Sequence, residues 1–94
     1  MQLINKEGYN MYKHTDYLTN PKKYELFKTA IINTNLLTHN GHSDLTKGSI
    51  VGIKFRCIAP NKLYRRSEPV YSVTLQNGLF WGDVYANSLT NFVL

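Results

Sequence analysis

This 94-residue chain has one cysteine, three prolines and one tryptophan, and it lacks any long run of apolar residues. Because the single cysteine, Cys57, cannot form an internal disulfide, the chain is not one of the small domains that disulfides hold together. No stretch is apolar and long enough to span a bilayer, and no apolar N-terminal segment resembles a signal peptide. We therefore expect a cytoplasmic protein in a reducing environment, without membrane contact.

Acidic residues are also scarce. Six of them stand against eleven lysines and arginines, which leaves a formal net charge of +5. This balance favours an anionic partner, either nucleic acid or an acidic protein or nucleoprotein surface. A chain of this length is typical of one domain with a modest apolar core. We expect residues 1–94 to fold as a single unit.

Specific motifs for catalysis, metal binding or cofactor binding are lacking. The nearest candidate is His39-Asn40-Gly41-His42-Ser43-Asp44, whose imidazole groups are potential zinc ligands or general bases. Two histidines supply at most half of a structural zinc site, and Asn-Gly is ordinary loop sequence. We predict a polar turn here, with no metal, no cofactor and no catalytic residue, so the protein is not expected to be an enzyme.

The residues that are present divide the chain near Gly48, with helical and irregular signals before it and strand signals after it. Asn20 and Pro21 predict the start of a helix, because asparagine caps free amides and proline suits the first helical position. Apolar residues then recur at spacings of three and four: Leu26, Phe27, Ala30 and Ile31. This stripe predicts a helix that runs to about Asn33 and packs on the second half. The segment 9–18 fits either a short helical turn or an extended arm.

After Gly48 the apolar residues no longer recur at the helical spacing of three and four but at every second position. The alternating apolar residues are Val51, Ile53, Phe55 and Cys57. They predict a strand with one buried face, from which Lys54 and Arg56 project outward, and which Pro60 ends. A basic, aromatic loop over 61–69 should follow. The later segments 85–89 and 91–94 predict a short helical turn and a closing strand.

Asn77-Gly78 is the strongest local signal in the chain, because this pair favours a two-residue type I′ hairpin turn. The turn predicts a register in which Thr74 faces Trp81. The predicted inner face consists of Tyr71, Val73, Leu75, Phe80 and Val84. Trp81 should lie on the solvent side, unless the N-terminal half covers it. If the turn belongs to a longer loop, the register slips by one residue and Trp81 enters the core.

Residues 47–94 resemble an SH3-like small β-barrel at the level of the fold. The resemblance rests on Lys47-Gly48-Ser49-Ile50-Val51, Val70-Tyr71-Ser72-Val73-Thr74-Leu75-Gln76-Asn77-Gly78, Trp81-Gly82-Asp83-Val84 and Asn87-Ser88-Leu89. Tudor-like, KOW-like and bacterial SH3-like domains share this order of strand, long loop, hairpin, short turn and closing strand. The acidic, aromatic-rich loop of eukaryotic SH3 domains and a full aromatic cage are missing, so the resemblance implies a fold without a ligand class. The predicted fold class is α+β, with an N-terminal helical region (1–47) packed on a C-terminal SH3-like antiparallel β-barrel (48–94).

The candidate binding residues combine cationic and aromatic side chains. They are Lys54, Arg56, Lys62, Tyr64, Arg65, Arg66, Trp81 and Tyr12. Cationic groups neutralise phosphates, and aromatic rings stack on unpaired bases. We therefore predict a non-enzymatic protein that contacts nucleic acid or a nucleic-acid-processing complex.

Two other predictions concern protein partners. The alternative function is a protein-interaction module or inhibitor, such as a small phage-type accessory protein that blocks a host enzyme or defence complex. A homodimer is also predicted, through an apolar edge of the closing strand that ends at Leu94.

Overall fold

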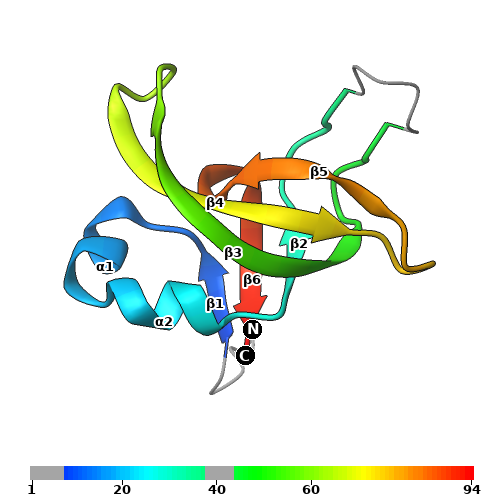
Figure 1. Ribbon diagram of the computed structural model, residues 1–94, viewed down its shortest axis with the longest axis horizontal. Coiled ribbons are helices and arrows are strands. Elements are labelled where there is room, and N and C mark those ends of the chain that lie inside the picture. Colours follow the sequence, from blue (N-terminus) through cyan, green and yellow to red (C-terminus); the bar gives the residue numbers. More distant parts are fainter. Residues whose placement is uncertain (1–7, 38–43) are drawn as a thin grey trace.

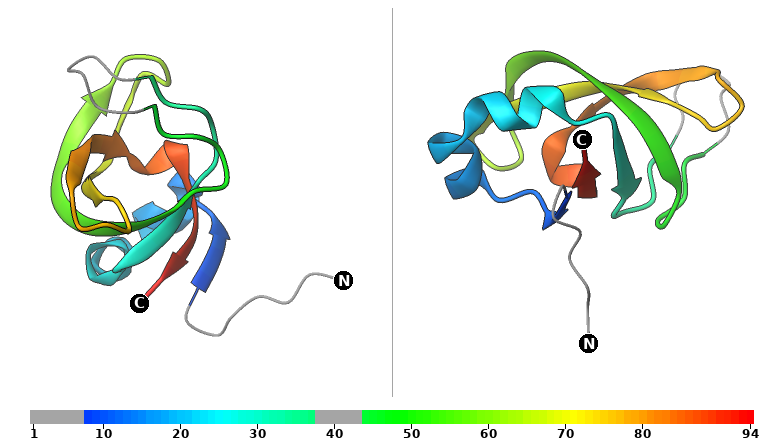
Figure 2. Two further views of the ribbon diagram at one scale, coloured as in Figure 1. Left: turned by 90° about the vertical axis from the view of Figure 1, so that its right-hand side faces the viewer. Right: turned by 90° about the horizontal axis from the view of Figure 1, so that it is seen from below.

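Two short helices and one antiparallel sheet make up this α+β fold, in a computed structural model that describes residues 8–37 and 44–94 (Figure 1). The elements are β1 (Gly8–Met11), α1 (His14–Thr19), α2 (Pro21–Leu26), β2 (Thr29–Ile32), β3 (Ile50–Asn61), β4 (Arg66–Thr74), β5 (Phe80–Tyr85), the 3-10 turn η1 (Ala86–Ser88) and β6 (Leu89–Val93). The six strands are hydrogen-bonded in the order β1-β6-β2-β3-β4-β5. The sheet curls, but its end strands β1 and β5 do not pair, so the predicted barrel is not closed (Figure 2).

The helix predicted from Asn20 to Asn33 is confirmed at its start and wrong at its end. Pro21 is the first residue of α2, but the chain leaves the helical conformation at Phe27, whose φ and ψ are −65° and 141°. Residues 29–32 then form β2, where Ala30 and Ile32 are buried and alternate with more exposed residues. Threonine and isoleucine favour strands because their side chains branch at Cβ. The apolar period in this segment is therefore two.

Because β2 lies between β3 and β6, the N-terminal half supplies a central strand of the sheet. The region 1–47, predicted as helical and irregular, thus contributes two strands as well as two helices within its described residues, 8–37 and 44–47. The segment 9–18, predicted as either an extended arm or a short helical turn, contains both: its first residues belong to the extended strand β1, and its last residues belong to the short helix α1. β6 in turn lies between β1 and β2, so the closing strand has no free edge of the kind predicted for a homodimer.

Aromatic side chains fill the core between the helices and the inner face of the sheet. Tyr24 of α2 packs edge-on against Phe27 and Phe92, with ring centroids 5.4 and 5.5 Å apart. Tyr71 of β4 contacts Phe92 at 5.8 Å and donates its hydroxyl to the carbonyl oxygen of Tyr24. Tyr71 is fully buried, as predicted. This cluster holds α2 to the sheet.

The β4–β5 turn has three residues, 76–78, and not the predicted two. Leu75 N donates to Leu79 O at 2.8 Å, and Gly78 N donates to Leu75 O at 2.9 Å. Gly78 has a φ of +88°, which glycine adopts without steric cost. The longer turn shifts the register by one residue, so Thr74 faces Phe80.

A bulge at Trp81 restores the predicted pairing of Ser72 with Asp83. The predicted places of the two aromatic residues in this strand are therefore both wrong. Phe80 is 55% exposed, whereas Trp81 is partly buried and packs against the core. The alternative given for a longer turn, in which the register slips by one residue, is the one observed, and it explains both positions.

β3 continues through Pro60 to Asn61, although Pro60 was expected to end it. Pro60 pairs with Ser67 of β4 and lies outside the stretch of β3 that pairs with β2. Proline is tolerated in such edge stretches of a strand.

Within residues 8–37 and 44–94, neither α1 nor α2 has the length and apolar character of a membrane-spanning helix.

Candidate functional site

The two longest strands, β3 and β4, are joined by a tight turn at the end of the molecule opposite to the β4–β5 turn (Figure 1). Asn61 shapes this turn, because its side-chain oxygen accepts from Leu63 N at 3.1 Å and its carbonyl oxygen accepts from Tyr64 N at 3.2 Å. Arg65 has a φ of 54°, in the left-handed region. The segment predicted as a loop is thus a compact hairpin, and residues 60–67 are called the hairpin tip below.

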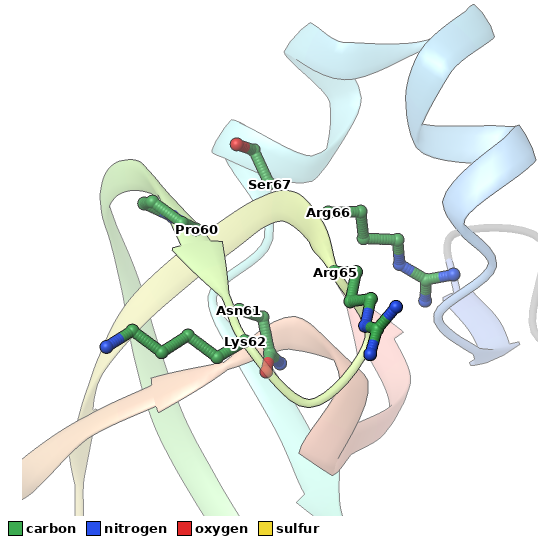
Figure 3. A pocket seen from close by; sticks show the side chains of 6 residues that line it. All are labelled: Pro60, Asn61, Lys62, Arg65, Arg66 and Ser67. Carbon is green, nitrogen blue, oxygen red and sulfur yellow. The ribbon is translucent and has the colours of Figure 1, made fainter.

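The hairpin tip surrounds an open hollow of about 400 Å³. The hollow is lined by Pro60, Asn61, Lys62, Arg65, Arg66 and Ser67 (Figure 3). Arg65 and Arg66 extend to one side of the turn and Lys62 extends to the other. No acidic residue occurs between 60 and 67, so the surface of the hollow is positively charged.

Glu68, which directly follows the tip in the sequence, lies in the interior and is completely buried. Its carboxylate accepts hydrogen bonds from Asn61 Nδ2 at 3.2 Å and from Asn87 N at 2.8 Å. Arg66 Nε lies 3.9 Å from the same carboxylate. A buried charge needs such partners, and here they tie the base of the hairpin tip to η1.

Arg66 connects this buried carboxylate to the exposed part of the turn. Its Nε atom is buried and makes no hydrogen bond within the described part of the chain. Its guanidinium carbon lies 5.3 Å from the centre of the Tyr64 ring, within cation–π distance. Arg66 therefore has structural contacts on both sides, while Arg65 and Lys62 are exposed.

Tyr12 was predicted to contact a partner, but it is buried in the core. Its hydroxyl shares a hydrogen bond of 3.1 Å with His14 Nδ1. Burial raises the pKa of Tyr12 to about 12, and the negative charge of Glu68 adds to the rise. Trp81 also packs against the core, so neither residue belongs to the exposed surface of the hairpin tip.

Lys54 and Arg56 project outward from β3, as predicted, but they lie apart from the hairpin tip. Lys62 comes six positions after Arg56, which corresponds to roughly 20 Å along an extended chain. Arg56 forms an ion pair with Asp83, and Ser72 Oγ donates to the same carboxylate at 3.1 Å. The eight predicted residues are therefore not one site: four lie in the hairpin tip, two on the outer face of the sheet and two against the core.

Three residues of this region were missed from the sequence: Asn61, Ser67 and Glu68. Glu68 had a detectable signal, because it is the single acid in the basic segment 61–69, next to strand-forming residues. An isolated acid in such a place is a candidate for an internal partner of the arginines.

The predicted polar turn 39–44 falls largely outside the described residues, which include neither of its histidines. Within 8–37 and 44–94, no three histidine, cysteine, aspartate or glutamate side chains gather as metal ligands would.

Comparisons with protein-family models, with curated proteins and with solved structures gave no match to this chain.

Proposed function

We propose that this protein is a non-enzymatic binder of nucleic acid, acting alone or within a nucleic-acid-processing complex, and that the hairpin tip is its contact surface. One observation carries the proposal. Three cationic side chains, Lys62, Arg65 and Arg66, line the hollow, and Glu68, the first acidic residue after the tip in the sequence, is completely buried. Such a surface attracts phosphate groups.

The test is the salt dependence of oligonucleotide binding, measured by fluorescence anisotropy. About three phosphate contacts to a single strand predict a slope of about −2 for log K against log salt concentration. Arg65→Asn should flatten this slope by about 0.7. Asparagine tolerates the left-handed conformation at this position, so the turn should keep its shape.

The matched control is Lys22→Gln, which removes one exposed charge from α2, outside the hairpin tip. It should change affinity less than Arg65→Asn does. A slope near zero, or equal effects of the two substitutions, would contradict the proposal.

We also propose that the fold is related to SH3-like small barrels. The order from β2 onward supports this relation, because strand, long connection, two hairpins, 3-10 turn and closing strand follow one another, and β6 pairs with β2. The first strand of that order is then β2, and not the strand after Gly48.

A reducing, cytoplasmic setting is proposed on the single cysteine, Cys57, which is exposed and unpaired.

The alternative, a protein-interaction module or a phage-type inhibitor of a host enzyme or defence complex, is favoured by a separate feature. At the β4–β5 turn Leu79 and Phe80 are 62% and 55% exposed. Large exposed apolar side chains are typical of protein contacts. Capture from nuclease-treated lysate separates the two functions, since a protein held directly by this surface survives nuclease and is lost with Phe80→Ser.

A further inference from the structure

Tyr64 is an exposed aromatic residue of the hairpin tip, and it has two contacts within the tip. Its backbone N–H is held by Asn61 O, and the guanidinium of Arg66 lies over its ring. The side chain is nevertheless 45% exposed, and its neighbour Leu63 is 79% exposed. The tip therefore presents an aromatic and apolar surface directly beside its cations.

The two arginines that follow Tyr64 in the sequence lie on one side of the turn, opposite to Lys62. Arg65 and Arg66 extend in the same direction, and both line the hollow (Figure 3). Arg65 lies within the turn in the left-handed conformation, with a φ of 54°. A non-glycine residue in this conformation is unusual and is often retained at binding sites.

An exposed aromatic ring beside two arginines favours single-stranded nucleic acid over a duplex. In a duplex the base faces are stacked on one another, so an exposed tyrosine ring has no base to contact. In a single strand, an unpaired base is free to stack on such a ring while arginines bind the adjoining phosphate.

We propose that the hairpin tip binds single-stranded nucleic acid, with an unpaired base stacked on Tyr64 and the adjoining phosphate held by Arg65 and Arg66. This inference rests on the function proposed above and names its ligand class. The short turn offers room for few nucleotides, so the stacked base should supply a large share of the affinity.

The experiment compares three fluorescent DNA probes of about twelve nucleotides at one low salt concentration: a single strand, its duplex, and an abasic single strand with the same phosphates. The protein should prefer the single strand to the duplex by about tenfold, and removal of the bases should weaken binding by a similar factor. Tyr64→Leu should cause the same loss with the intact single strand and no further loss with the abasic one. Tyr64→Phe keeps the ring and should bind as the unchanged protein does.

Because Tyr64 is exposed, its substitutions are expected to leave the fold intact, and circular dichroism spectra of the variants check this. Equal affinity for duplex and single strand, together with no effect of Tyr64→Leu, would overturn the single-strand inference while nucleic-acid binding itself stands. If none of the probes binds, the proposed function fails, and this inference fails with it.

Discussion

At the scale of single residues, Trp81 shows how one extra turn residue moves a side chain from one environment to another. The three-residue turn and the bulge place it against the core, and Phe80 takes the exposed position. From Arg66 to Thr74, β4 spans roughly 25 Å, so Trp81 lies far along the sheet from the hairpin tip. Its role is therefore expected to be packing.

Trp81→Ala should lower the free energy of unfolding by about 2 kcal/mol, less than for a fully buried tryptophan, and should leave oligonucleotide affinity unchanged. Urea unfolding and anisotropy titrations measure the two effects, and Trp81→Phe should recover part of the stability. Lost binding with unchanged stability would show instead that Trp81 is a contact residue.

Tyr12 provides a test that depends on pH. Its pKa in the folded protein is about 12, above the ordinary tyrosine value of 10.0. Between these values the unfolded chain loses the phenolic proton while the folded chain retains it, so stability falls as pH rises. Burial also raises the pKa of Tyr71, which steepens the fall.

In Tyr12→Phe the decrease in stability between pH 9 and pH 12 should be smaller than in the unchanged protein. The comparison uses the change with pH, because loss of the hydrogen bond to His14 shifts stability at every pH. Parallel curves for the two proteins would mean that Tyr12 ionises in the folded state as it does in water.

At the scale of elements, the hairpin tip depends on Glu68. Removal of its carboxylate leaves Asn87 N and Asn61 Nδ2 without an acceptor in the interior, and leaves Arg66 without its buried partner. Groups that lose a buried partner destabilise a protein strongly.

Glu68→Ala should therefore lower the free energy of unfolding by about 3 kcal/mol, and hydrogen exchange at the Asn87 amide should accelerate. Glu68→Gln keeps an oxygen for Asn87 and should cost about half as much. If Glu68→Ala were as stable as the unchanged protein, the carboxylate of Glu68 would not be a structural support of the hairpin tip.

The elements also differ in how far the sequence predicted them. The start of α2, the outward direction of Lys54, η1 and the closing strand follow from local signals, and all four are observed. β2 was missed because an apolar pair at 26–27 followed by one at 30–31 fits a helical stripe, while the pairing with β3 and β6 that selects a strand is not local.

The candidate site was also predictable from the sequence only in part. The residues from Lys62 to Arg66 are contiguous, so their proximity was predictable. The places of Tyr12 and Trp81 depend on tertiary packing and on a bulge, which a list of residue types does not contain.

At the scale of the whole molecule, the two halves of the chain are interleaved. Among the strands that the structure describes, β2 from the N-terminal half lies between β3 and β6 and connects them in the sheet. Tyr24 and Phe27 of that half also fill the core against Phe92. The region 48–94 alone therefore lacks both a central strand and much of its core.

A fragment comprising residues 48–94 should show no cooperative unfolding transition by circular dichroism, whereas the full chain should show one. Addition of a peptide covering residues 8–47 should restore part of the signal. Cooperative unfolding of the isolated fragment would mean that the barrel region is an autonomous unit after all.

The central claim is that the hairpin tip is the nucleic-acid contact surface, and a titration of the isotope-labelled protein with a short single-stranded oligonucleotide, followed by NMR, tests it most directly. The largest shifts of backbone amide signals are predicted at residues 61–67, with little change at Leu79, Phe80 and Trp81. Shifts centred on the β4–β5 turn, or no shifts at any oligonucleotide concentration, would contradict the claim.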